Sequence, residues 1–143
     1  MSRRFLPDVN VLLYALNRGS VHHPPCRKWL EEATAAGDAI LINGLTECAL
    51  LRISTLPRIA FCPMPVALRF WQALVDCPSS RRAVSGPSHR LHFTGFITEL
   101  GLSGNDVNDA WLAALAIEQQ ATLVSTDEGF ARFTKLDWLN PVA

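Results

Sequence analysis

The stretch DAWLAALAIEQQATLVSTD, residues 109–127, joins an acidic residue, a long apolar run, a short apolar run and a second acidic residue. Residues 110–117 are all apolar, and a helix that is apolar on every side is buried on every side. Residues 121–124 form a brief apolar run, which is typical of a central parallel strand. The stretch therefore predicts a buried helix that leads into a buried strand.

The same alternation of short strands and helices extends through the rest of the chain. Strands that alternate with helices at this spacing predict an α/β fold, a three-layer sandwich with a short, mostly parallel sheet between helices. The length of 143 residues predicts one domain over 1–143. Prolines interrupt residues 55–102, where the pattern is least informative. We expect strands at 4–8, 39–42 and 121–124, and helices at 9–16, 24–36, 45–54, 66–75, 89–100 and 109–119.

The composition excludes several classes of protein. Hydrophobic residues make up 49% and charged residues 18% of the chain, which argues against disorder. Thirteen basic residues balance thirteen acidic ones, so overall charge does not make the protein a general binder of polyanions. Asp8 follows the first few apolar residues, which argues against a signal peptide. No apolar run reaches 18 residues, which argues against a membrane span. We expect a cytoplasmic protein with no membrane partner.

Several acidic residues lie where strands end or helices begin, and each alone fits an ordinary structural role. Asp8 and Asp127 follow strands and could cap the next helix. Glu47 falls in a first helical turn, where the helix dipole favours a negative charge. Asp106 stands three residues after Ser103, as in a capping box, and we favour this role over that of a metal ligand.

Asp109 does not fit such a role, because it lies beyond the expected cap and is followed by the apolar run. Its neighbours three and four positions away are Asn105, Asp106, Leu112 and Ala113, so no local cation is available. An unpaired carboxylate buried there would cost several kcal/mol, on the order of the desolvation of one ion. A positive partner must therefore come from elsewhere.

Chain geometry predicts that four acids share one edge of the sheet. Asp8 and Asp127 follow strands, and Glu47 and Asp109 begin helices that face the same carboxyl edge, where open α/β sheets bind ligands. Carboxylates brought together repel one another unless a cation is bound. Oxygen ligands without Cys or His suit Mg²⁺ or Mn²⁺. We predict a metal site built from Asp8, Glu47, Asp109 and Asp127.

These segments resemble, in order and spacing, the successive blocks of a PIN domain, and in detail those of the VapC-type ribonuclease toxins. The resemblance spans nearly the whole chain except residues 56–102. Its blocks are LPDVNVLL (6–13), LTE (45–47) with RIS (52–54), NDAWLAALA (108–116) and LVSTD (123–127).

The resemblance implies a metal-dependent endoribonuclease in which the four acids bind the metal. It also implies a homodimer that is inhibited by a small antitoxin. One or two Mg²⁺ ions would activate water and neutralise charge on the phosphoryl oxygens of RNA. Asn10 and the hydroxyl groups of Ser125 and Thr126 would organise the site. From its place in the sequence, one to two turns after Glu47, Arg52 is the preferred contact to RNA phosphate.

Two other functions compete with this interpretation. The first is a phosphoryl-transfer domain, receiver-like or haloacid-dehalogenase-like, since these also place Asp at the ends of parallel strands. Asp8-Val9-Asn10 lacks the second Asp of a D-x-D motif, and no lysine stands where a late strand should end, which disfavours it. The second is a PIN-like module that binds RNA without cleaving it, which the full set of acids disfavours.

Overall fold

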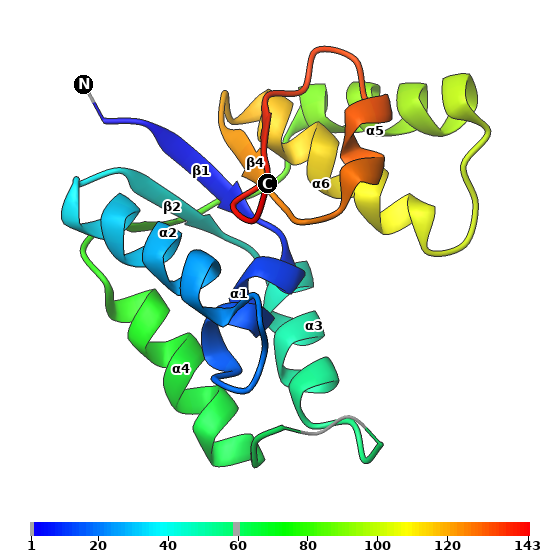
Figure 1. Cartoon of the computed structure of the whole chain (residues 1–143). Coiled ribbons are helices and arrows are strands. Elements are labelled where there is room, and N and C mark those ends of the chain that lie inside the picture. The colour runs from blue at the N-terminus through cyan, green and yellow to red at the C-terminus, as the bar shows by residue number, and fades with distance from the viewer. Residues whose placement is uncertain (1, 59–60) are drawn as a thin grey trace.

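The computed structural model describes residues 2–58 and 61–143. Its strands and helices alternate through most of the chain, in the order shown in Figure 1. The strands are β1 (Arg4–Pro7), β2 (Ala39–Ile42), β3 (Ser80–Arg82), β4 (Thr122–Val124) and β5 (Trp138–Leu139). The helices are α1 (Val9–Leu16), α2 (His23–Ala35), α3 (Gly44–Ser54), α4 (Met64–Asp76), α5 (Pro87–Leu100), α6 (Asp106–Glu118) and the 3₁₀ helix η1 (Glu128–Arg132).

The strands form a five-stranded sheet in the order β3-β2-β1-β4-β5, and every pair is parallel. In register, Leu6 of β1 is opposite Leu123 of β4. The chain leaves β1 toward β2 on one side and reaches β4 on the other, so the strand order reverses between β1 and β4. This is the position at which open α/β sheets bind ligands.

Helices cover both faces of the sheet, which confirms the predicted α/β class. Figure 1 shows α1, α2 and α4 on one side and α5 and α6 on the other. The first layer buries Leu12, Leu50 and Trp71 against one face of the sheet. The second layer buries Leu115 and Phe130 against the other face. Each layer thus has its own apolar core, and the sheet separates the two.

Two strands were not predicted from the sequence, whereas the short helix after Asp127 was expected from the cap that Asp127 could provide. β3 consists of Ser80, Arg81 and Arg82 at the edge of the sheet, so it has no apolar run to indicate a strand. β5 is only two residues long. η1 begins at Asp127, whose side chain accepts a hydrogen bond from Gly129 N. The helices expected at 66–75 and 89–100 begin earlier, because proline is accepted in the first turn of α4 and α5.

In the part of the chain that the structure describes, none of the helices has the length and apolar character needed to cross a bilayer.

The core of the second layer should be sensitive to truncation at Leu123, which is fully buried in β4. Leu123→Ala should lower the free energy of unfolding by about 3 kcal/mol, because it removes buried methyl groups and leaves a cavity. Urea denaturation measures the change. Val21→Ala serves as the control, since Val21 is 84% exposed. Equal stability of the two variants would contradict the placement of β4 in the core.

Candidate active site

The carboxyl ends of β1 and β4 are joined by the side chains of Asp8 and Ser125. Asp8 N donates to Val124 O at 2.8 Å, which continues the pairing of the strands by one residue. The Ser125 hydroxyl group donates to Asp8 Oδ2 at 2.9 Å, and both residues are buried. The two strands thus place the first predicted acid at the point where the strand order reverses.

Ser125 Oγ is the centre of a small hydrogen-bond network. Asn10 Nδ2 donates to it at 3.1 Å, and Asp127 N donates to it at 3.1 Å. Thr126 N donates to Asn10 Oδ1 at 3.4 Å. The hydroxyl group has one proton, which it gives to Asp8, so it can serve the other two groups only as an acceptor. Asn10 and the Ser125 hydroxyl group thus lie in contact with each other beside Asp8, whereas Thr126 joins the network through its backbone N–H and not through its hydroxyl group; their roles at the site stay predictions.

Asp8 and Asp127 each cap a helix as well as facing the site. Asp8 Oδ1 accepts from Val9 N at 2.7 Å at the start of α1. Asp127 Oδ1 accepts from Gly129 N at 2.8 Å at the start of η1. Both predicted capping roles are confirmed. Each cap uses one carboxylate oxygen and leaves lone pairs on the other.

Asp109 and Asp106 lie in the first turn of α6 and share a partner from η1. Arg132 Nη2 is 3.2 Å from Asp109 Oδ2 and 3.4 Å from Asp106 Oδ1. The expectation that a cation must reach Asp109 from elsewhere is thus met by Arg132. The capping box of Ser103 and Asp106 is wrong: Asn105 is the N-cap of α6 and its side chain makes no capping bond, while Asp106 pairs with the arginine.

Sequence reasoning missed Arg132 because the pair joins residues 23 positions apart. Nothing in the local pattern of Gly129 to Phe133 distinguishes this arginine from a solvated one. Only the demand of Asp109 for a positive partner pointed to such a residue, without saying which.

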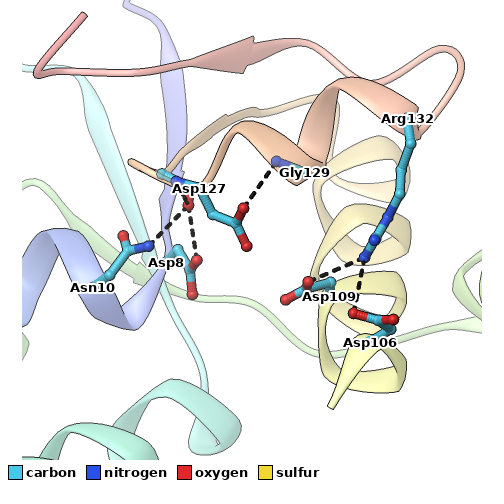
Figure 2. Close-up of polar contacts among 8 residues, drawn as sticks. Asp8, Asn10, Asp106, Asp109, Asp127, Gly129 and Arg132 are labelled. Atoms are coloured by element: carbon cyan, nitrogen blue, oxygen red, sulfur yellow. Dashed lines mark hydrogen bonds and ion pairs between the residues drawn. The ribbon is translucent and has the colours of Figure 1, made fainter. Parts of the chain in front are cut away.

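The carboxylates of Asp8, Asp109 and Asp127 face a common space in Figure 2 and influence one another. Burial, offset in part by the hydrogen bonds from Ser125 and Val9, raises the pKa of Asp8 above its ordinary value, and the charge of Asp127 adds to the increase. The pKa of Asp109 is raised to about 6, chiefly by burial and then by the charges of Asp8 and Asp127, while the charge of Arg132 lowers it. The space between these acids therefore carries negative charge that the arginine does not balance.

A cavity of about 230 Å³ opens beside Asp8 and Asp109, between α3 and α6. Arg52 lines it from α3, as expected for a residue that contacts a ligand in this site. Apolar side chains and two amides complete the wall. The lining residues are Asp8, Val9, Leu45, Thr46, Ala49, Arg52, Ile53, Asn105, Asn108, Asp109 and Leu112.

Glu47 lies in the first turn of α3, at the predicted edge, and is half-buried. Thr46, beside it, lines the cavity, but Glu47 does not. Among the described residues its carboxylate has no hydrogen bond or ion pair with another side chain. Its place among the interacting acids stays a prediction.

The residues present fit a hard divalent cation. Within residues 2–58 and 61–143, no three His, Cys, Asp or Glu side chains are already arranged to hold a metal ion. The chemistry of the donors is nevertheless that of a Mg²⁺ or Mn²⁺ site, since Asp8, Asp109 and Asp127 offer only oxygen. A cation between these carboxylates would remove the repulsion that raises the pKa of Asp109.

Solved structures of related fold support the architecture. The VapBC2 complex of Rickettsia felis, bound to a DNA fragment from its promoter, contains a chain with a TM-score of 0.72 and 20% identity. The match covers 96% of this chain and 98% of that one. VapC20 of Mycobacterium tuberculosis, described as a toxin that cleaves the sarcin–ricin loop, matches with a TM-score of 0.65 and 11% identity, over 92% and 98% of the two chains. At these identities the likeness shows the fold.

Sequence relatives define the family. Ribonuclease VapC37 of Mycobacterium tuberculosis is 35% identical over 138 residues, which are 95% of this chain and 96% of the relative. Ribonuclease VapC25 of the same organism is 34% identical over 139 residues, with coverage of 96% and 98%. The model of the PIN domain matches residues 5–136. The chain therefore belongs to the PIN domain family, and within it to the VapC-type ribonucleases.

Proposed function

We propose that this protein is the toxin of a toxin–antitoxin pair and hydrolyses RNA with a divalent cation held by Asp8, Asp109 and Asp127. The observation that carries the proposal is the group of carboxylates whose charges raise the pKa of Asp109 at the reversal of strand order. A purely structural cluster has no reason to collect like charges beside an open cavity. A nuclease needs them, because the phosphodiester group is itself negative.

Each residue has a role set by its contacts. When bound, Mg²⁺ or Mn²⁺ lowers the pKa of water and neutralises charge on the phosphoryl oxygens. Asp8 is held rigidly by Ser125 and Val9, so it presents fixed lone pairs. Asp127 is exposed and uses one oxygen for its cap, so its other oxygen can orient the attacking water and accept its proton.

Arg52 and Glu47 complete the proposal from α3. Arg52 is exposed at the wall of the cavity that contains Asp8 and Asp109, where its guanidinium group can hold a phosphate next to the cleaved bond. We propose Glu47 as the fourth carboxylate ligand. Support for it comes from its position at the same edge of the sheet, in the first turn of α3.

The partners follow from the relatives. Solved chains of the same fold occur in complexes that pair a VapC with a VapB, and we propose that a small antitoxin binds this protein in the cytoplasm. We also propose a homodimer. Exposed apolar side chains of α4 and α5 support buried contacts with other chains, notably Leu68 (49% exposed) and Leu91 (75% exposed).

The two competing functions have less support. Phosphoryl transfer of the haloacid-dehalogenase type uses a second Asp two residues after the first, but Asn10 stands at that position and its amide donates to Ser125 Oγ. A module that binds RNA without cleaving it would gain stability if it lost an acid that is repelled by its neighbours. Asp109 is such an acid, and its presence disfavours this alternative.

Cleavage should depend on the acids and on the cation. With Mg²⁺ or Mn²⁺, Asp8→Asn and Asp109→Asn should each reduce the rate of RNA cleavage by about 10²–10³-fold, because charge at the reacting phosphate is no longer balanced. Gel analysis of labelled single-stranded and structured RNA measures the rate. Asp76→Asn is the matched control, since Asp76 is an exposed acid of α4 on the other side of the sheet.

The same assay tests the proposed fourth ligand and the need for a cation. Glu47→Gln should also reduce the rate if Glu47 is the fourth ligand. Cleavage by the wild type at full rate in EDTA would overturn the proposed function. Stable phosphorylation of Asp8 by a phosphodonor would favour the phosphoryl-transfer alternative instead.

Metal-free protein should show the repulsion at Asp109 as a dependence of stability on pH. The carboxyl group of Asp109 ionises near pH 3.8 in the unfolded chain and near pH 6 in the folded chain. As pH rises through this window, Asp109 therefore lowers the free energy of unfolding, and the loss is complete above it. Asp109→Asn should stabilise the protein at pH 7 by about 1 kcal/mol, since loss of the pair with Arg132 offsets part of the gain. The gain should vanish at pH 4.

Urea denaturation in EDTA at the two pH values provides the measurement. Asp106→Asn is the control, because it also breaks a contact with Arg132 but lies outside the group facing Asp8. A variant Asp109→Asn that is less stable than the wild type at pH 7 would show that repulsion is not the dominant effect there.

Expression in cells should show the toxin and its antidote. Induction of the wild-type chain alone should arrest growth, and co-expression of the neighbouring reading frame should restore it, because the antitoxin blocks the site. Asp8→Asn should permit growth without the partner. Growth counts, together with mapped ends of cellular RNA, test this. Unimpaired growth with intact RNA while the wild-type chain accumulates would contradict it.

A further inference from the structure

Arg132 contacts the acidic group from η1, on the side of Asp109 that faces away from Asp8 and Asp127 (Figure 2). Figure 2 shows its side chain reaching down to Asp109 and Asp106, with Asp127 and Asp8 on the opposite side of Asp109. Only one nitrogen, Nη2, contacts both acids, at 3.2 Å and 3.4 Å. The arginine therefore pairs with one oxygen of Asp109 and does not form the two-bond fork that makes arginine–carboxylate pairs strongest.

The guanidinium group is held by packing as well as by charge. Its carbon lies 5.0 Å from the centre of the ring of Phe133, which is buried. The side chain of Arg132 is only 32% exposed, and its Nε is buried without a hydrogen-bond partner among the described residues. An arginine that merely extended into solvent would satisfy Nε with water. The attraction between the guanidinium group and the acids compensates for the cost of burying Nε without a hydrogen bond.

The single charge of Arg132 does not, in turn, neutralise all the acids of the site. Arg132 Nη2 is shared between one oxygen of Asp109 and one oxygen of Asp106, and among the described residues it makes no ion pair with Asp8 or Asp127. One positive charge thus faces several carboxylates and leaves the site negative. A divalent cation among Asp8, Asp109 and Asp127 would approach the same carboxylate that Arg132 contacts, and the two positive charges would repel each other.

We propose that Arg132 is the internal counter-ion of the site, which holds Asp109 in the metal-free protein and weakens binding of the divalent cation. This inference rests on the proposed function, because it requires the cation to bind at Asp109. In the metal-free protein, Arg132 offsets part of the repulsion among the acids. Its positive charge also makes the affinity of the site for the cation lower than it would be without the arginine. It is a positioning residue and makes no contact with the reacting atoms.

The affinity for Mn²⁺ in the absence of RNA distinguishes this role from a structural one. Isothermal titration calorimetry on the whole protein should show that Arg132→Ala binds Mn²⁺ about three- to tenfold more tightly than the wild type, because one repelling charge is gone. Arg132→Lys should stay close to the wild type. Arg69→Ala is the matched control: it removes one exposed arginine from α4, in the other helical layer, and should leave the affinity unchanged.

A second readout covers the case in which Arg132→Ala folds poorly. Arg132→Gln keeps the size of the side chain and removes its charge. Its melting temperature without metal should fall below that of the wild type, and saturating Mn²⁺ should raise it by more than it raises the wild type. Unchanged or weaker Mn²⁺ binding by either folded variant would overturn the inference and leave the proposed function intact. A wild type that binds no Mn²⁺, or an Asp8→Asn variant that binds it normally, would instead overturn the metal site itself.

Discussion

The hydrogen bond from the Ser125 hydroxyl group to Asp8 joins two strands whose residues lie 117 positions apart in the chain. Because this hydroxyl group also accepts from Asn10 and from Asp127 N, its single proton is committed to Asp8. Both oxygens of Asp8 then act as acceptors. These hydrogen bonds offset part of the effect of burial, which still raises the pKa of Asp8, and the charge of Asp8 in turn raises the pKa of Asp109.

Helix capping and metal binding are not alternatives in this fold. A parallel strand that runs into a helix ends where the backbone N–H groups of that helix are unpaired, so an acid there is an effective cap. The same acid also lies at the carboxyl edge where ligands bind. Asp8 and Asp127 each use one oxygen for the cap, and the other oxygen is the one that we propose as a ligand of the cation. The structural role fixes the direction of the carboxylate and thus prepares it for the functional one.

The sequence predicted what short-range patterns and strand–helix alternation determine. The three apolar strands, the order of the helices and the acids at the edge follow from periodicity and from the geometry of parallel sheets. β3 escaped detection because an edge strand of Ser80, Arg81 and Arg82 pairs through its backbone alone. The pair of Arg132 with Asp109 escaped because two elements meet only after folding. The spacing of Ser103 and Asp106 suggested a capping box, but in the folded chain Asp106 forms an ion pair with Arg132 of η1 instead.

Asp109 is the residue at which local rules and the fold disagree most. Asp8 gains a cap and a hydroxyl partner, and Asp127 gains a cap and solvent, whereas Asp109 has, among the residues that the structure describes, a single contact with Arg132 to offset its burial. Its raised pKa records that deficit. A ligand that binds only the folded chain stabilises it by an amount that grows with its concentration relative to its Kd. The proposed cation would therefore relieve the deficit at Asp109 when it binds, and we propose that Arg132 relieves part of the same deficit in the metal-free protein.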